Sequence, residues 1–420
     1  MHSVAAAAPP RSDSAHAGKV TRWFASVDGL RGFAAAAVCL HHLHGDFWRW
    51  QETVLNGAAG NFFRAHPLGA ILSYPLGAFG FLGVHLFFVV SGFCIHMPQA
   101  GKTQPLDGRT FALRRALRIY PLYVVTFLVS MFLAHVRGGE AAESATLPNF
   151  LGHFVFWYHN GLGASKDFGS PPVLWTIAVE VQFYIIYALL LPVLRRIGIG
   201  RATLIAMSVD VLYRVGWQVL ETSHPHMSSL LAPVRFAPIR FGEWMLGAWI
   251  AESLVRGSAQ PLWKLLSRHG VMIGSLIIAT DIAITILMGS GREGMDVPAI
   301  LGFTAILAGV AGRETVATTA PPSVGSRIRA WLGMRSYSLY LVHYPVMLVT
   351  VDLFARTMGA HTRAEKDQLA GTPLMLAAVI VAGIAMLVAT AIAYRLIEGP
   401  SHRLARTLSA RIRKSGAHAA

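Results

Sequence analysis

Two ionisable residues, Arg31 and His42, lie eleven residues apart in the first strongly apolar stretch of the chain, SVDGLRGFAAAAVCLHHL. Eleven residues is close to three turns of an α-helix, so both side chains project from one face, roughly 16 Å apart along the axis. Hydrocarbon solvates neither group, and an ionisable pair in a membrane helix therefore indicates a functional site that faces the interior of a helical bundle. Because histidine titrates near neutral pH, His42 is suited to take a proton from a hydroxyl group.

The same stretch contains two further polar residues, Asp28 and His41. His41 is adjacent to His42 but projects about a quarter turn away from the face that carries Arg31. A lone histidine in a membrane helix is more often a structural hydrogen-bonding residue than a catalytic one. Two adjacent histidines with an arginine and an aspartate favour catalysis, with His42 as the base and His41 in a supporting position.

Three arginines, Arg114, Arg115 and Arg118, precede the apolar part of the segment LRRALRIYPLYVV. Arginines at the end of a membrane span are often topology signals only, and that interpretation has about equal weight here. Arg115 and Arg118 lie at positions i and i+3 and therefore on one helix face. Guanidinium groups bind phosphates by paired hydrogen bonds, so this face suits a phosphorylated ligand such as coenzyme A.

Further polar residues occur inside three other apolar segments. Glu180 lies in PPVLWTIAVEVQFYIIYALLLP and His343 lies in RSYSLYLVHYPVMLV. A carboxylate in a membrane helix needs a partner or a water-filled cavity, so Glu180 either forms a salt bridge between helices or takes part in a site. His343 could be structural in the same way. Ser91 and Gly92, in GFLGVHLFFVVSGFCIHMP, are interpreted as packing residues that let helices approach closely.

The composition is that of a membrane protein. Of the 420 residues, 54% are hydrophobic and 14% are charged, whereas soluble domains contain about 25% charged residues. Apolar runs near the roughly 20 residues needed to cross the hydrocarbon recur along the chain. We predict an all-α polytopic transmembrane bundle with about ten spans, near residues 27–45, 79–97, 119–136, 173–194, 203–220, 236–255, 271–288, 297–312, 331–354 and 373–394.

The formal net charge of +15 would indicate nucleic-acid binding in a soluble protein. Here lysines and arginines concentrate in alternate segments between the predicted spans. With a cytoplasmic N-terminus, every inside segment carries more of them than the average outside segment, as the positive-inside rule expects. We therefore predict an even number of spans with both termini in the cytoplasm, and no nucleic-acid partner.

The expected organisation is a disordered cytoplasmic tail at residues 1–22, one transmembrane domain at 23–400 and a basic cytoplasmic tail at 401–420. The tail at 1–22 is rich in alanine, proline and serine and lacks the apolar core of a signal peptide. The two cysteines, Cys39 and Cys94, lie within predicted spans, so no disulfide framework is expected.

Taken together, these segments resemble the acyltransferase-3 family of integral membrane acyltransferases. The resemblance covers the whole chain, through DGLRGFAAAAVCLHH, FFVVSGF, RRALRIYP, LWTIAVEVQFY, YSLYLVHYP and YRLIEGP in matching order and spacing. The arginine–ten residues–histidine signature of that family falls on Arg31 and His42, which selects His42 over His41. The cytoplasmic arginine pair of the family falls on Arg115 and Arg118.

A family glutamate that follows a Trp-Ser or Trp-Thr dipeptide falls on Glu180, with Thr176 where serine is commoner. The chain departs from the family at Val181, where a second carboxylate is frequent, and at His85, where an acidic residue is common. These departures concern the acceptor more than the chemistry. We also expect a membrane domain without the SGNH-type hydrolase domain that is fused to some members.

The resemblance implies an acyltransferase in the cytoplasmic (inner) membrane that moves an acyl group, most often acetyl, from cytosolic acyl-CoA to a hydroxyl of a surface or exported glycan or glycolipid. Arg115 and Arg118 would hold coenzyme A phosphates, and Arg31 the pantetheine end or the reacting carbonyl. His42, oriented by Glu180, would act as general base or carry the acyl group transiently. Other candidates are Arg114 for the donor and, as substrate contacts or supporting residues, His41, His343, Asp28 and Thr176.

Several points stay open in this interpretation. No metal is expected, because the histidines are too scattered to form a ligand set. The acceptor could instead be a lipid, a macrolide-like small molecule or an amino sugar. Homo-oligomerisation is also left open. The competing class is a multi-pass transporter, since intramembrane charges also mark transport paths. No inverted repeat with paired broken helices is visible, which argues mildly against a transporter.

Overall fold

A computed structural model of the chain describes residues 26–43, 67–137, 152, 173–223, 237–257, 259–288, 296–314, 323–359 and 373–418. The regular elements in this part of the chain are all helices. The α-helices are the helix at 26–43, α3 (Pro67–His96), α4 (Gly108–Arg137), α7 (Trp175–Ile197), α8 (Ile199–Ser223), α10 (Ala237–Val255), α11 (Pro261–Met288), α12 (Val297–Arg313), α13 (Val324–Thr357), α15 (Pro373–Ala393) and α16 (Gly399–His418). Short helical segments of other types follow α3 at Met97–Gln99 and α15 at Tyr394–Glu398. The predicted all-α class is therefore confirmed, whereas the tail at 1–22 lies outside the described residues.

Six of these helical segments are long and apolar enough to cross a membrane. They are Leu82–Gln99, Gly108–Leu133, Trp175–Ile197, Pro261–Ile284, Val324–Thr357 and Ala377–Arg413. The other four predicted spans also correspond to helices, namely 26–43, α8, α10 and the shorter apolar helix α12. Charged residues in α8 and α10 lower their apolarity. The number of about ten spans and the cytoplasmic termini stay predictions.

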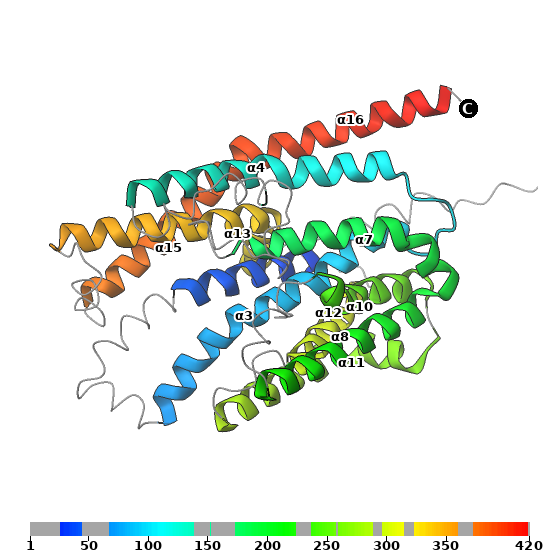
Figure 1. The fold of residues 1–420 in the computed structure, drawn as a ribbon, viewed down its shortest axis with the longest axis horizontal. Coiled ribbons are helices and arrows are strands. Elements are labelled where there is room, and N and C mark those ends of the chain that lie inside the picture. The colour runs from blue at the N-terminus through cyan, green and yellow to red at the C-terminus, as the bar shows by residue number, and fades with distance from the viewer. Residues whose placement is uncertain are drawn as a thin grey trace, which may run out of the picture.

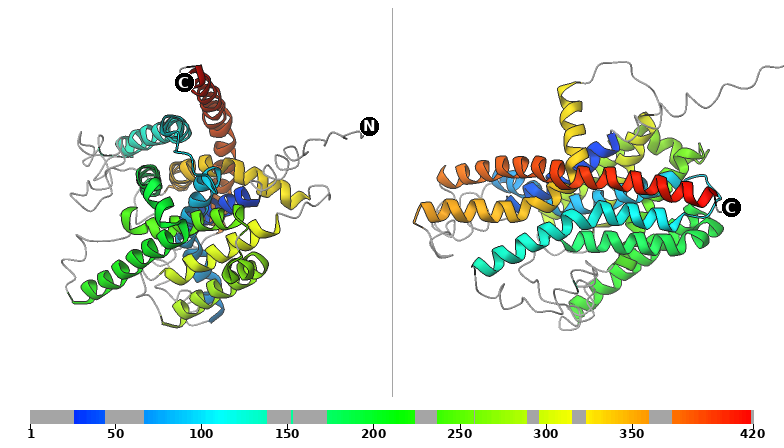
Figure 2. Two further views of the ribbon diagram at one scale, coloured as in Figure 1. Left: turned by 90° about the vertical axis from the view of Figure 1, so that its right-hand side faces the viewer. Right: turned by 90° about the horizontal axis from the view of Figure 1, so that it is seen from above.

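Most helices run along the longest axis of the molecule, with α16 at the edge of the bundle (Figures 1 and 2). The segment predicted as a basic tail is thus the helix α16, which lies along α4. The side chain of Arg114 on α4 donates a hydrogen bond of 3.0 Å to the buried Ser409 of α16. Part of the tail is therefore held against the bundle.

Helix α3 forms the centre of the bundle and packs closely on α10. At this contact two glycines bring the backbones together. A Cβ atom on Gly92 would lie 1.8 Å from the carbonyl oxygen of Trp244, and one on Gly247 would lie 1.9 Å from that of Val89. Small residues allow such close approach between membrane helices. The packing role predicted for Gly92 is confirmed, and the contact determines where its neighbour Ser91 lies.

The polar ends of several helices lie together at one end of the bundle. His96, the last residue of α3, places Nε2 2.9 Å from a carboxylate oxygen of Glu252 on α10. Arg195, near the end of α7, donates to the backbone carbonyl of Gln104 at 2.6 Å.

Both cysteines are free, as the sequence predicts, with Cys39 buried and Cys94 half-buried.

Candidate active site

Arg31 projects from the helix at 26–43 toward α13. Its Nε donates to the hydroxyl of Ser336 at 2.8 Å and a terminal nitrogen donates to the carbonyl of Gly333 at 3.0 Å. Asp28, one turn earlier, forms an ion pair with Arg31 at 3.1 Å. The two helices touch at this level, since a Cβ on Gly333 would lie 2.3 Å from the carbonyl oxygen of Asp28. The guanidinium of Arg31 is therefore held between two closely packed backbones.

A small cavity collects residues from five helices that are far apart in the sequence. Its walls include Arg31, Ser91 of α3, Arg115 and Arg118 of α4, Glu180 and Tyr184 of α7, and Ser336 and Tyr337 of α13. Three of the predicted clusters, those of Arg31, Arg115–Arg118 and Glu180, thus meet in one place. The free space is about 20 Å³, which suffices for little more than one water molecule. A substrate must therefore displace side chains to enter.

Glu180 is the carboxylate of this cavity and is buried. One of its oxygens accepts hydrogen bonds from the hydroxyl of Ser91, at 2.9 Å, and from the hydroxyl of Tyr184. The guanidinium carbon of Arg115 lies 5.7 Å from the centre of the Tyr184 ring. Nε of Arg115 is buried and has no hydrogen-bond partner among the described residues. Buried donors are normally satisfied, so this group indicates a place for an anionic or carbonyl oxygen of a ligand.

The residues that line this cavity carry more positive than negative charge. Three guanidinium groups, those of Arg31, Arg115 and Arg118, line it with the single carboxylate of Glu180. Two carboxylates behind the lining offset part of this charge: Asp28 pairs with Arg31, and the buried Glu398 interacts with Arg31 and Arg118. The lining itself favours negatively charged or strongly polarised groups.

His42 lies on the same helix as Arg31 but contacts other residues. Its ring centre is 5.3 Å from that of His343 and 5.4 Å from that of Tyr344, both on α13. The ring of the adjacent His41 is 5.2 Å away. His41 packs instead on α3, where a Cβ on Gly80 would lie 1.6 Å from the Cβ of His41. The adjacent histidines therefore face different helices.

The side chain of His343 is fully buried beside His42. Its Nδ1 lies 2.6 Å from the backbone carbonyl of Tyr340, so this nitrogen carries the hydrogen. In the neutral ring Nε2 is then an acceptor, and it has no hydrogen-bond partner among the described residues. His343 thus presents an unused basic nitrogen inside the bundle.

Tyr340 and Thr176 connect the histidine pair to the arginine cavity. The hydroxyl of Thr176 lies 2.7 Å from that of Tyr340, and both donate to the carbonyl of Val173. Thr176 lies one turn before Glu180 on α7, as Tyr340 lies one turn before His343 on α13. The ring of Tyr340 also stacks on Phe87, which lines the cavity. The two groups of polar residues are therefore neighbouring parts of one site.

Two expectations of the sequence analysis need correction. Glu180 was expected to orient His42, but its carboxylate accepts from Ser91 and Tyr184 in the arginine cavity. The ring that packs beside His42 is that of His343. Arg114 was expected with the donor-binding arginines, but it points to α16 and is not in the cavity lining. The physical reason is that neighbouring residues on a helix point in different directions. Their spacing in the sequence does not show which other helix each of them faces.

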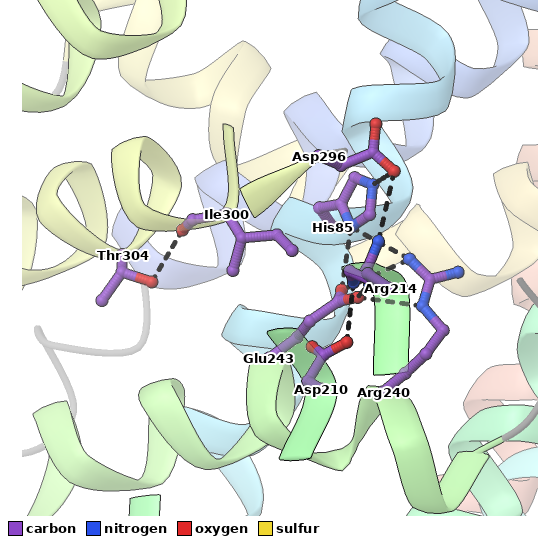
Figure 3. A network of polar contacts seen from close by, with 8 residues as sticks. All are labelled: His85, Asp210, Arg214, Arg240, Glu243, Asp296, Ile300 and Thr304. Carbon is purple, nitrogen blue, oxygen red and sulfur yellow. Dashed lines mark hydrogen bonds and ion pairs between the residues drawn. The ribbon is translucent and has the colours of Figure 1, made fainter. Parts of the chain in front are cut away.

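A second polar cluster, absent from the sequence predictions, joins α3, α8, α10 and the start of α12 (Figure 3). Glu243 is fully buried at its centre and accepts from Arg214 at 2.6 Å and from Arg240 at 2.9 Å. His85 lies between two carboxylates, 2.8 Å from Glu243 and 3.3 Å from Asp296. Arg214 also contacts Asp210 at 2.7 Å and Asp296 at 3.4 Å, and a terminal nitrogen of Arg240 lies 2.9 Å from Nδ1 of His85.

Sequence reasoning thus missed two polar features of the fold. Ser91 was interpreted as a packing residue, although it donates to Glu180 and lines the cavity. The ionic cluster around Glu243 was missed although charged residues inside predicted spans were a visible signal.

In the described part of the chain, no group of three or more His, Cys, Asp or Glu side chains is arranged to hold a metal ion.

The known proteins that this chain resembles are acyltransferases. A family model described as an acyltransferase domain matches residues 24–395. The peptidoglycan O-acetyltransferase OatA of Listeria monocytogenes is 28% identical over 378 residues, which cover 82% of this chain and 52% of OatA. Acyltransferase MdmB of Streptomyces mycarofaciens is 27% identical over 395 residues, covering 90% of this chain and 92% of MdmB.

A further relative is the O-acetyltransferase OatA of Staphylococcus aureus, 26% identical over 181 residues that cover 40% of this chain and 25% of that protein. The chain spans about half the length of the peptidoglycan O-acetyltransferase relatives from Bacillus subtilis and Listeria monocytogenes. No solved structure matches the chain.

Proposed function

The chain belongs to the acyltransferase-3 family and is a multi-pass membrane acyltransferase for groups other than aminoacyl groups, and we propose that it moves an acetyl group from acyl-CoA to a hydroxyl of a cell-surface or exported glycan. The observation that carries this proposal is the cavity in which Arg31, Arg115 and Arg118 surround Glu180. A positively charged, enclosed cavity suits the phosphates of a thioester's carrier.

The donor occupies the arginine cavity in this proposal. Arg115 and Arg118 hold the phosphorylated carrier by charge-assisted hydrogen bonds, because guanidinium groups match phosphate oxygens. Arg31 holds the pantetheine end of the donor, because His42, the proposed base, lies roughly 16 Å farther along the same helix. Ser91 and Tyr184 hold Glu180 in the wall. This carboxylate limits the positive charge that the three arginines would otherwise concentrate.

The acceptor hydroxyl reacts at the histidine pair. His42 takes the hydroxyl proton while the oxygen attacks the thioester carbonyl, so a C–O bond forms and the C–S bond breaks. The leaving thiolate takes up a proton, which gives the acetyl ester and free coenzyme A. His343, with Nδ1 held by the Tyr340 carbonyl, presents Nε2 to the same region and supports the base. Transient attachment of the acyl group to His42 is the alternative route.

The relatives support the choice of acceptor class. Three of those described above are named O-acetyltransferases, two of these for peptidoglycan. We propose a glycan as the acceptor, reached from the outer side of a cytoplasmic membrane while the donor enters from the cytoplasm. A lipid or small-molecule acceptor is the alternative for the same chemistry.

Purified full-length protein in proteoliposomes tests this proposal. With acetyl-labelled acetyl-CoA and a soluble glycan acceptor, the expected result is label in an alkali-labile ester on the glycan with release of free coenzyme A. Label found only in lipid would replace the glycan by a lipid acceptor. Movement of glycan across the membrane without consumption of acetyl-CoA would indicate a transporter and contradict the proposal.

A further inference from the structure

A large recess, separate from the arginine cavity, opens where α7 ends, α8 begins and α10 ends. Its volume is about 720 Å³, within the range of pockets that take small organic ligands. Its principal side chains are those of Lys102, Arg195, Arg196, Trp249, Glu252 and Arg256. The chemistry assigned so far makes no use of this recess.

The recess lies at the boundary between the membrane and water. Three of the segments long enough to cross a membrane have an end within three residues of its lining, and these are Leu82–Gln99, Trp175–Ile197 and Pro261–Ile284. Trp249 is half-buried in the same wall. Tryptophan is enriched at this boundary because its ring is apolar and carries one N–H donor. A ligand in the recess therefore lies at the level of the lipid headgroups.

Two of the four cations that line the recess are engaged by the protein itself. Arg256 pairs with Glu252, the single carboxylate of the lining. That carboxylate also lies 2.9 Å from Nε2 of His96. Arg195 donates to the backbone carbonyl of Gln104 at 2.6 Å. These contacts hold the two arginines in the wall and leave no carboxylate of the lining for the other two cations.

The other two cations, those of Lys102 and Arg196, are directed to a ligand. Both side chains are exposed, and neither has a hydrogen-bond or ion-pair partner among the described residues. Gly198 and Gly200 also line the recess, so the first turn of α8 forms part of its wall. The first N–H groups of a helix lack an intrahelical acceptor and favour an anion. The recess therefore suits an anionic group such as a phosphate.

The helix faces that carry these groups continue as exposed apolar surface. Val193 lies three residues before Arg196 on α7, and Leu204 lies four residues after Gly200 on α8. Each is therefore one turn farther into the membrane on the same helix face. Their side chains are 51% and 70% exposed. A free phosphate would make no use of this apolar surface, whereas the acyl chains of a lipid would cover it.

We propose that this recess binds the headgroup of an anionic phospholipid, with the acyl chains along Val193 and Leu204. Lys102 and Arg196 contact the phosphate by charge-assisted hydrogen bonds, and the start of α8 faces it. The site is distinct from the arginine cavity, and the inference does not depend on the function proposed above. Because the bound lipid contacts several helix ends only in the folded protein, it raises the stability of the fold.

The test titrates phosphatidylglycerol into the full-length protein in a neutral detergent, with the Kd measured by native mass spectrometry. K102Q/R196Q removes two exposed cations of the recess, and K264Q/R268Q removes two exposed cations of α11 that do not line it. Both variants lose the same charge, so they are matched for non-specific attraction. We expect K102Q/R196Q to raise the Kd about tenfold or more, and K264Q/R268Q to leave it within about twofold.

Thermal unfolding gives a second measurement. Phosphatidylglycerol should raise the unfolding midpoint of the unaltered protein and of K264Q/R268Q, and this gain should be lost in K102Q/R196Q. Equal loss of binding in the two double variants, or no loss in K102Q/R196Q, would overturn the inference.

Two further probes distinguish the source of the phosphate. Phosphatidylcholine, whose headgroup has no net charge, should bind the unaltered protein at least about fivefold more weakly than phosphatidylglycerol. Glycerol 3-phosphate, which has the phosphate but no acyl chains, should not displace phosphatidylglycerol at equal concentration. Displacement by glycerol 3-phosphate would assign the recess to a soluble phosphate and overturn the proposal, as would equal binding of the two lipids.

Discussion

His41 and His42 are neighbours in the chain, yet the fold gives them different surroundings. His42 packs beside His343 and Tyr344 of α13, whereas His41 packs against Gly80 of α3. The same contrast separates Arg114, which donates to Ser409, from Arg115, which lines the cavity. Such adjacent pairs supply matched controls, because each pair shares its residue type and its depth along the helix.

The histidine pair yields the first prediction. H42A should lower acetyl transfer at least about 100-fold, since a general base typically contributes that much or more. H41A should keep activity within a few-fold of the unaltered protein, because its ring packs away from His343. Ester formation on the glycan measures both, with the amount of protein in the membrane as control. Equal loss of acetyl transfer in H42A and H41A would show that the packing of the two rings does not identify the base.

The adjacent arginines Arg114 and Arg115 yield the second prediction. R115Q should raise the Kd for acetyl-CoA about tenfold, because it removes a charge-assisted donor from a buried cavity. R114Q should change it by less than about twofold, since Arg114 points to α16. Equilibrium binding of acetyl-CoA to both variants checks this. A larger effect for R114Q than for R115Q would move the donor site to the α4–α16 contact.

At the level of helices, two backbone contacts decide where polar side chains meet. Gly92 and Gly247 allow α3 to touch α10, and Gly333 allows α13 to touch the helix at 26–43. These contacts set the positions of Ser91 and Arg31. A volume increase at either contact must push helices apart, since the nearest atoms are backbone.

Substitution of Gly333 tests the second contact. In G333A the new methyl would lie 2.3 Å from the carbonyl oxygen of Asp28, so the helix at 26–43 must shift and Arg31 with it. We expect activity to fall at least about tenfold, because displacements near 1 Å cost that much or more. G383A on α15 is the control, since nothing lies within 4 Å of that Cβ position. Unchanged activity in G333A would show that Arg31 does not need this contact.

Across the whole molecule, the ionic cluster around Glu243 joins one half of the bundle, and the arginine cavity joins the other. The cluster takes residues from α3, α8, α10 and the start of α12 (Figure 3). The cavity takes its residues from the helix at 26–43 and from α3, α4, α7 and α13. Helix α3 belongs to both groups, so a change in the cluster can reach Ser91 through α3.

The cluster is expected to carry stability more than chemistry. E243Q leaves buried arginines without their carboxylate, a change that costs about 3–5 kcal/mol in buried ion pairs. D352N breaks the ion pair of Asp352 with the exposed Arg356, 3.0 Å apart, and should cost at most about 1 kcal/mol. Thermal unfolding of both variants in one detergent measures the difference. A midpoint for E243Q at or above that of D352N would contradict this role.

The amino-acid sequence alone determined the helical membrane class and most of the residues of the site. Both follow from local physics. An apolar run near 20 residues long predicts a membrane helix, and an ionisable group within that run indicates a candidate site, whatever the rest of the chain contains. Arg31, Arg115, Arg118 and Glu180 were found in this way, and the structure brings them into one cavity.

Only the tertiary structure decided which of these groups touch. Glu180 meets the arginines and Ser91, His343 takes the place beside His42, and His85 pairs with Glu243 and Asp296. The helices involved are separated by long stretches of sequence, and each helix face could pack against several other helices. Packing at small residues selects one arrangement, and that selection depends on the shapes of two helices at once. The pairing of Arg31 and His42 on one face was therefore predictable, whereas the partners of each were not.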